Sequence, residues 1–274
     1  MDRFDRQRRI FGDEGQERLA AATIGVVGGG GLGSFVVLEL AYLGVGKILI
    51  VDDDCLDDEK SNRNRLVGAW ESHPLGVPKV EILRDLALMI DSGIEIEMVE
   101  DRLECDKAKA ALAAVDVVVG CVDHDGPRFA LNKFCCQHGL PLIDSASDTM
   151  PEEEEVVFGG RVCVATPETG CLVCFGVLDR DEVNEYLESP EQRADREAVY
   201  GVHEDALTQG GPSVITVNGV VASIAATELM VLVTGIRAPI AHQDWRGHQG
   251  SLRRVSDREE ACYYCGLRPA SPVP

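Results

Sequence analysis

The stretch Gly28-Gly29-Gly30-Gly31-Leu32-Gly33-Ser34 decides the fold of this 274-residue chain. A short apolar run, residues 23–27, precedes it, and a helix-like stretch, residues 35–43, follows it. A second apolar run, residues 47–51, ends in Asp52-Asp53-Asp54. This order predicts a strand, a glycine turn, a helix and a second strand within one nucleotide-binding unit.

The spacing of Gly28, Gly30 and Gly33 fits the Gly-x-Gly-x-x-Gly pattern. Glycines let the backbone turn tightly and approach a phosphate, and the N-terminus of the following helix favours negative charge. A carboxylate after the second strand, such as Asp52, is placed to hold a ribose hydroxyl. We therefore expect a bound nucleotide here, although this loop alone does not say which one.

Apolar runs and helix-like stretches alternate through the first half of the chain. We expect a helix over residues 79–90, a strand buried on both faces over 115–122, and a helix over 128–138. Strands that alternate with helices predict an α/β fold with a doubly wound, mostly parallel, Rossmann-like sheet. Asp123 stands where the buried strand ends, which is where ligands collect in such sheets; a helix cap is the alternative role.

The pattern changes after Pro151, and we expect antiparallel strands to continue the sheet. Residues 156–165, which contain Gly159-Gly160, are interpreted as a hairpin or strand pair. Residues 214–236 are interpreted as a buried strand followed by a helix rather than a membrane span, because they carry Asn218 and Glu228.

We expect a single domain over residues 1–274. Residues 3–150 would form its nucleotide-binding half, and residues 151–266 a zinc-bearing, partner-binding and dimerisation half, followed by a tail over 267–274. Residues 175–212 are acidic and polar, and we interpret them as an exposed excursion, with a surface insertion of no function as the alternative.

The formal net charge is −21, from 26 basic and 47 acidic residues. This balance argues against a nucleic-acid partner, because binding phosphates along a strand requires a basic surface. Lysine supplies only 6 of the basic residues, a pattern that fits either adaptation to high salt or an ordinary solvated acidic surface. The polar, arginine-rich start MDRFDRQRRIF does not resemble a signal peptide, so we expect a cytoplasmic protein without a membrane partner.

Four of the ten cysteines form two Cys-x-x-Cys pairs, Cys171/Cys174 and Cys262/Cys265. In a reducing compartment such pairs predict a tetrahedral structural zinc site, with a redox role as the alternative. Neither pair opens a thioredoxin-like unit, which favours zinc. The remaining cysteines lie mostly in apolar contexts and are interpreted as buried small hydrophobic residues.

Taken in order, these motifs and several polar ones resemble the ThiF/MoeB/HesA superfamily of ubiquitin-activating-type adenylyltransferases. The resemblance covers residues 3 to 265, and its motifs here are Arg3/Arg6-Gln7, Gly15-Gln16, Gly28 to Ser34, Gly44-Val45-Gly46, Asp52/Asp54, Ser61-Asn62/Arg65, Gly76/Lys79, Asp123 and Arg128.

The resemblance implies a homodimer that uses ATP and Mg²⁺ to convert the C-terminal carboxylate of a ubiquitin-like or sulfur-carrier protein, with a Gly-Gly-type tail, into an acyl-adenylate. By position, Arg65 and Lys79 would hold the triphosphate and Asp123 the Mg²⁺. Asp52 would hold the ribose, with Asp54 and Asn62 lining the site. Arg6 would act across the dimer interface. Zn²⁺ on the four paired cysteines would tie the C-terminal segment to the preceding region.

The chain departs from the family pattern in three places. The loop between Asp54 and Ser61 is longer by about two residues, and His124 stands where asparagine is common, either to contact the nucleotide or to face solvent. No cysteine lies between Cys174 and Cys262, where relatives often carry a thioester-forming one. We therefore expect adenylation without an enzyme thioester, although another cysteine could serve. The activated carboxylate could also belong to a peptide, or less plausibly, given the acidic charge, to a tRNA-linked amino acid.

Two other classes of function stay open. A non-catalytic dimeric ATP-binding scaffold of the same fold is opposed by the retention of Arg6, Arg65, Lys79 and Asp123. An NAD-dependent oxidoreductase would leave those residues unexplained, and the sequence offers no convincing acid or base for hydride transfer.

Overall fold

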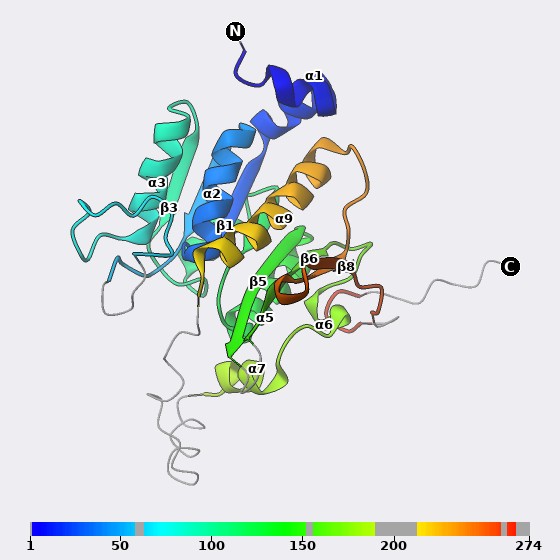
Figure 1. Cartoon of the computed structure of the whole chain (residues 1–274). Coiled ribbons are helices and arrows are strands. Elements are labelled where there is room, and N and C mark those ends of the chain that lie inside the picture. Colours follow the sequence, from blue (N-terminus) through cyan, green and yellow to red (C-terminus); the bar gives the residue numbers. More distant parts are fainter. Residues whose placement is uncertain (1, 58–62, 152–155, 190–212, 259–261, 267–274) are drawn as a thin grey trace, which may run out of the picture.

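The computed structural model describes residues 2–57, 63–151, 156–189, 213–258 and 262–266. Its centre is one eight-stranded sheet, with strand order β3-β2-β1-β4-β5-β6-β7-β8 (Figure 1). The strands are β1 Thr23–Val27, β2 Lys47–Val51, β3 Glu95–Val99, β4 Val117–Gly120, β5 Leu142–Pro151, β6 Val156–Ala165, β7 His242–Arg246 and β8 Ser251–Arg254.

The strands β1 to β5 pair in parallel, and the pairs from β5–β6 to β7–β8 are antiparallel. This confirms the predicted doubly wound sheet with an antiparallel continuation. The chain crosses from β3 to β4 on the other side of β1, so the carboxyl ends of β1 and β4 form the point where strand order reverses. Open α/β sheets bind ligands at such a point.

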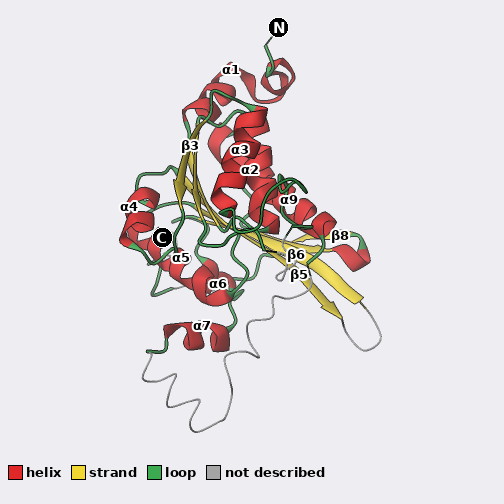
Figure 2. Ribbon diagram, turned by 90° about the vertical axis from the view of Figure 1, so that its left-hand side faces the viewer, coloured by secondary structure: helices red, strands yellow, loops and turns green. Residues whose placement is uncertain are grey.

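Helices cover both faces of the sheet (Figure 2). One face carries α2, α3 and α9, and the other carries α4, α5 and α6. The helices are α1 Asp5–Ala21, α2 Gly31–Leu43, α3 Lys79–Ile90, α4 Asp106–Leu112, α5 Asp125–His138, α6 Leu172–Phe175, α7 Arg180–Leu187 and α9 Ile215–Thr234, with a short 3-10 turn, η2 Gly247–Gln249.

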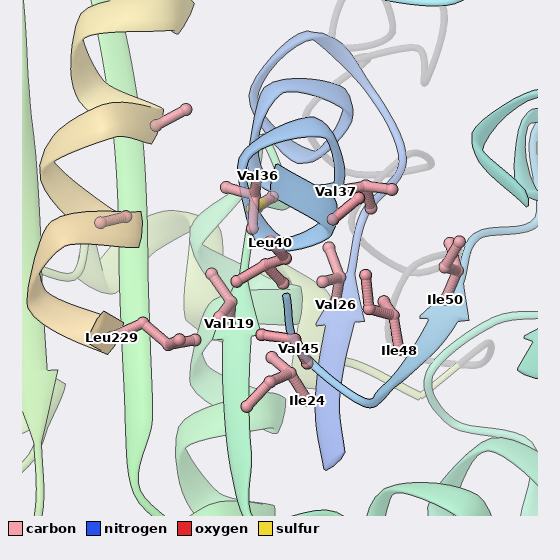
Figure 3. Packing of buried hydrophobic residues seen from close by; sticks show 14 of the residues in the cluster. Ile24, Val26, Val36, Val37, Leu40, Val45, Ile48, Ile50, Val119 and Leu229 are labelled. Atoms are coloured by element: carbon pink, nitrogen blue, oxygen red, sulfur yellow. The ribbon is translucent and has the colours of Figure 1, made fainter. Parts of the chain in front are cut away.

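Aliphatic side chains from neighbouring strands form the core under α2 (Figure 3). Val36 and Leu40 of α2 pack on Ile24 and Val26 of β1, and all four are fully buried. Burying side chains of this kind contributes about 1.5–3 kcal/mol each before entropy is subtracted. This packing holds the start of α2 rigidly at the end of β1.

The interpretation of residues 156–165 as a hairpin is wrong. These residues form the single strand β6, which pairs with β5 along its whole length. The glycines mark close approach of the backbones rather than a turn: a Cβ on Gly159 would lie 2.2 Å from the Trp245 carbonyl oxygen, and one on Gly160 would lie 2.4 Å from that of Ala146.

The expectation of a strand before the helix in residues 214–236 is also wrong, because α9 is a continuous helix from Ile215 to Thr234. It ends at Gly235, whose left-handed φ of 72° suits glycine. By length and composition α9 could cross a membrane, yet half of its most apolar window is buried against this fold. The β-branched residues at its start favour a strand, and packing against α2, β5 and β6 overrides that local preference.

Candidate active site

A cavity of about 380 Å³ opens at the carboxyl ends of the parallel strands. Its wall contains the glycine loop after β1, the Asp52–Asp54 turn after β2, residues 101–104 after β3, Asp123 after β4 and Asp148 from β5. Seven carboxylates and four cationic side chains line it among the described residues. An anionic ligand therefore requires added cations here.

The glycines of the loop have different physical roles. Gly28 has a φ of 94°, and a Cβ there would lie 2.7 Å from the Cys121 carbonyl oxygen. A Cβ on Gly33 would lie only 1.9 Å from the Gly28 carbonyl oxygen, so this glycine lets helix α2 approach the loop. A Cβ on Gly30 would meet no atom of the described residues within 4 Å, because Gly30 faces the open cavity.

The carboxylate of Asp52 stabilises the glycine loop through hydrogen bonds to the backbone. It accepts hydrogen bonds from the backbone amides of Gly29 at 2.5 Å and Asp54 at 2.9 Å. Burial raises the pKa of Asp52, and Lys79 opposes that shift. Asp52, the residue predicted to hold a ribose, therefore holds the glycine turn in place.

Lys79 begins helix α3 and is buried at the cavity wall. Its Nζ lies 2.6 Å from Asp54 Oδ2 and 3.9 Å from Asp52 Oδ1. The structure thus brings three predicted site residues into one ion-paired group. A triphosphate would have to compete with Asp54 for this ammonium group.

Arg65 and Asp123 lie on the same cavity wall without such partners. Neither side chain makes a hydrogen bond or ion pair with any residue that the structure describes. Asp123 is exposed, and it does not cap α5, whose N-cap residue is His124. Their free guanidinium and carboxylate groups are available to a phosphate and a divalent cation respectively.

Arg128 has a different role from the other cationic residues of the cavity. The residue is 3% exposed, and its side chain donates to Asp144 at 3.0 Å, to the Ser145 carbonyl at 2.9 Å and to the Val122 carbonyl. Asp144 is fully buried. Arg128 is consequently a buried clamp that joins α5 to β5, and its charge is already neutralised.

Helix α7 docks on the start of α5, beside Asp123. The carboxylate of Asp125 accepts the Asp179 amide at 2.6 Å, and the Asp125 amide donates to Glu182 at 2.9 Å. A Cβ on Gly126 would lie 2.4 Å from the Cβ of Tyr186, so only glycine allows this contact. Part of the predicted acidic excursion is therefore a docked helix; residues 190–212 lie outside the described residues.

Two groups in the cavity wall were missed by sequence reasoning. Asn218 at the start of α9 is 2% exposed, accepts from Ser147 at 2.8 Å and donates to Ser213 at 3.0 Å. The segment 101–104 after β3 also lines the cavity. Asn218 could have been found because it is a polar residue inside an apolar run. Residues 101–104 could have been found because they follow a parallel strand, where ligands bind.

Arg6 lies far from the cavity of its own chain. It is an exposed residue of α1, and α1 contacts the C-terminal end of α2 through the Gln16–Leu43 hydrogen bond of 2.9 Å. The glycine loop is at the other end of α2, about 20 Å away for a helix of 13 residues. Asn62, another predicted site residue, lies outside the described residues.

The two Cys-x-x-Cys pairs meet in space. The sulfur atoms of Cys171, Cys174, Cys262 and Cys265 all lie within 4.8 Å of one another. Sulfur–sulfur distances are 3.7 Å for Cys171–Cys174, 3.8 Å for Cys171–Cys262 and 3.4 Å for Cys174–Cys265. Four sulfurs around tetrahedral Zn²⁺ at about 2.3 Å would lie ~3.8 Å apart, so this cluster fits zinc.

Comparison with known proteins gives a family and close structural neighbours. A sequence model of the ThiF family matches residues 4–262. The SAMP-activating enzyme E1 of Haloferax volcanii is 31% identical over 85% of this chain and 76% of its own length. The sulfur carrier protein ThiS adenylyltransferase of Escherichia coli is 29% identical over 95% of this chain and 92% of its own.

Among solved structures, that of Escherichia coli MccB with MccA-N7isoASN superposes with a TM-score of 0.74 at 20% identity. It covers 97% of this chain and 74% of the MccB chain. At this level of identity the likeness supports the fold alone.

Proposed function

Because this chain belongs to the ThiF family, we propose that it is an ATP-dependent adenylyltransferase acting on the C-terminal carboxylate of a ubiquitin-like or sulfur-carrier protein. The observation that carries the proposal is the cavity itself. A glycine loop with one open face meets the free side chains of Arg65 and Asp123 and the ammonium group of Lys79. This is a site for a polyphosphate with a divalent cation.

In the proposed reaction, a carboxylate oxygen attacks the α-phosphorus of ATP. The bond from the α-phosphorus to the pyrophosphate oxygen breaks, and pyrophosphate leaves with its electron pair. A C-terminal carboxylate is ionised at neutral pH, so the step needs no general base. Catalysis then depends on positioning two anions and on stabilising charge at phosphorus.

The predicted site residues of the cavity have parts in this scheme. The open face at Gly30 leaves room for the α-phosphate, and Arg65 and Lys79 pair with the triphosphate. Asp52 accepts a ribose hydroxyl, and Asp54 lines the site. Asp123 would hold Mg²⁺, which screens phosphate charge when bound.

A second hollow supports a route for the partner's tail. It measures about 340 Å³ and runs over β5, β6 and β7. Asp148 lines both this hollow and the nucleotide cavity, so the two adjoin. Gly159 in its wall has no side chain to obstruct an extended peptide. A narrow tail ending in small residues suits such a path.

Arg6 would serve the cavity of a partner subunit, because it cannot reach its own. It makes no hydrogen bond or ion pair within the described ranges of the chain. An apolar surface for a homodimer lies on α9, where Val220 is 39% exposed beside Leu252, which is 52% exposed. The cavity has more carboxylates than cationic side chains, so an arginine supplied by the partner subunit would help to stabilise the negative charge of the phosphates.

The cysteines support adenylation without an enzyme thioester. A thioester requires an accessible thiolate. Cys121, the one cysteine among the described cavity residues, is buried, and burial raises the pKa of its thiol to about 12. None of the ten cysteines is fully exposed.

Exchange of labelled pyrophosphate into ATP tests the proposal. We expect exchange to require Mg²⁺ and a folded Gly-Gly-tailed carrier, and to be lost in Asp123→Ala. A short peptide with the same tail is the matched control that separates a protein substrate from a peptide substrate. Equal binding of Mg-ATP by wild type and Asp123→Ala, without exchange by either, would favour the scaffold alternative.

Complementation tests the role of Arg6. Arg6→Ala and Asp123→Ala should each be inactive alone. Random mixing of the two should restore about a quarter of wild-type activity, because half of the dimers then hold one complete site. No recovery in verified mixed dimers would remove the trans role of Arg6 and leave the adenylation proposal standing.

A further inference from the structure

Helix α5 passes directly beside the four-cysteine cluster. Asn132 lies on this helix, is fully buried, and accepts a hydrogen bond from the Leu172 amide through Oδ1 at 2.9 Å. Leu172 is the residue after Cys171, so Asn132 holds the backbone of the first Cys-x-x-Cys pair. Asn132 and Cys171 also line one small cavity of about 40 Å³.

The nitrogen of the same Asn132 amide lacks a hydrogen-bond acceptor among the described residues. Asn132 Nδ2 is buried and makes no hydrogen bond with the residues that the structure describes. A buried donor left unpaired carries a free-energy cost. Because Oδ1 is committed to Leu172, the planar amide fixes the direction of Nδ2. An acceptor that appears only in the metal-bound protein would remove this cost.

Cys171 offers that acceptor. Cys171 is the residue before Leu172, whose amide donates to Asn132, and it lines the same small cavity as Asn132. Four thiolates around Zn²⁺ carry a net charge of about −2, and three of these four cysteines are buried. A buried anion of this kind requires hydrogen-bond donors.

We propose that Asn132 is a positioning residue of the metal centre, whose Oδ1 fixes the Cys171 turn while its Nδ2 donates to the metal-bound Cys171 sulfur. This role is independent of the adenylation reaction and rests only on a metal ion being held by the four cysteines. It explains why a polar residue without exposed surface stands in the middle of α5.

Two substitutions separate the hydrogen bond from packing. Asn132→Leu keeps a similar volume and removes both ends of the amide, and Asn132→Asp keeps the acceptor and removes the donor. Gln243→Leu is the matched control. It also removes a buried amide, which donates to Glu228 at 2.9 Å, but Gln243 pairs with Val162 of the α9-facing core, away from the cysteine cluster.

Metal release is the principal readout. Zinc-loaded proteins are challenged with a colorimetric chelator, and the metal-binding constant is measured by competition. Loss of a hydrogen bond next to a ligand typically costs about 10–100-fold in metal affinity. We expect a loss of this size in both Asn132 variants and none in Gln243→Leu. Unchanged affinity in folded Asn132→Leu and Asn132→Asp would overturn the proposal.

A measurement on the wild-type protein covers the case in which the variants do not fold. In protein loaded with ¹¹³Cd, an N–H···S hydrogen bond transmits scalar coupling from cadmium to the donor proton. We expect a correlation between ¹¹³Cd and one Asn132 side-chain amide proton. Absence of that correlation, when the cysteine β-protons couple to cadmium normally, would also overturn the proposal.

Discussion

Substitution of Gly30 by valine gives the sharpest test of the nucleotide cavity. Within the described part of the chain, no atom lies within 4 Å of the position that a Gly30 Cβ would take, because that position faces the cavity. The fold should accept the new side chain within about 0.5 kcal/mol of the wild-type free energy of unfolding. The branched side chain would occupy space proposed for phosphate, and we expect Mg-ATP affinity to fall about 100-fold, or ~2.7 kcal/mol.

Gly33→Ala is the matched control, because its Cβ would lie 1.9 Å from the Gly28 carbonyl oxygen. Real contacts of this kind are about 3 Å or longer, so the loop would have to move by about 1 Å. Overpacking of this severity costs about 3 kcal/mol, which lowers the melting temperature by about 6–12 °C in a domain of this size. This variant should therefore lose stability as well as binding.

Titration calorimetry with Mg-ATP and thermal unfolding, measured on the same preparations, distinguish the two effects. The expected result is normal unfolding with weak binding for Gly30→Val, and early unfolding for Gly33→Ala. Wild-type affinity in a normally folded Gly30→Val protein would refute the assignment of this cavity to the phosphates.

Three further outcomes follow from the packing and the charge. Arg128→Met should lower the free energy of unfolding by about 3–5 kcal/mol in denaturant titrations, because Asp144 is left as a buried, unpaired charge; a loss under 1 kcal/mol would contradict the clamp. Gly126→Ala should detach α7 by displacing Tyr186, which limited proteolysis would report as faster cleavage within 180–187; an unchanged cleavage pattern would show that the helix tolerates the new methyl group. The melting temperature should rise between about 10 mM and 1 M KCl, because the Debye length falls from about 30 Å to 3 Å and screens the net charge of −21; a flat or falling profile would mean that self-repulsion is unimportant.

Periodicity and glycine spacing were sufficient for the nucleotide-binding half. Apolar runs such as residues 115–122 have few alternatives to a buried parallel strand, and the structure confirms β4 within that run. The later half was harder to predict because its local signals were ambiguous. Gly159-Gly160 suggested a turn but serves close strand packing, and the β-branched start of α9 suggested a strand but forms a helix.

Arg128 and Asn132 show a second limit of prediction. In the sequence, Arg128 is a cation next to a predicted ligand site, and only the fold reveals that Asp144 neutralises it in the core. Asn132 has no local signal at all, since its importance depends on the distant Cys171 turn. Contacts between residues far apart in the chain depend on tertiary packing, which local patterns do not encode.

The sequence by itself determined that a glycine loop, an alternation of strands and helices, and two Cys-x-x-Cys pairs are present, because these depend on local backbone freedom, periodicity and residue chemistry. Only the tertiary structure decided which glycine faces the cavity and which meets a neighbouring backbone. It likewise decided that Arg65 and Asp123 have no polar partner among the described residues, while Lys79 is ion-paired. The physical reason is that a side chain's partners, and hence its available charge, are set by what folds against it.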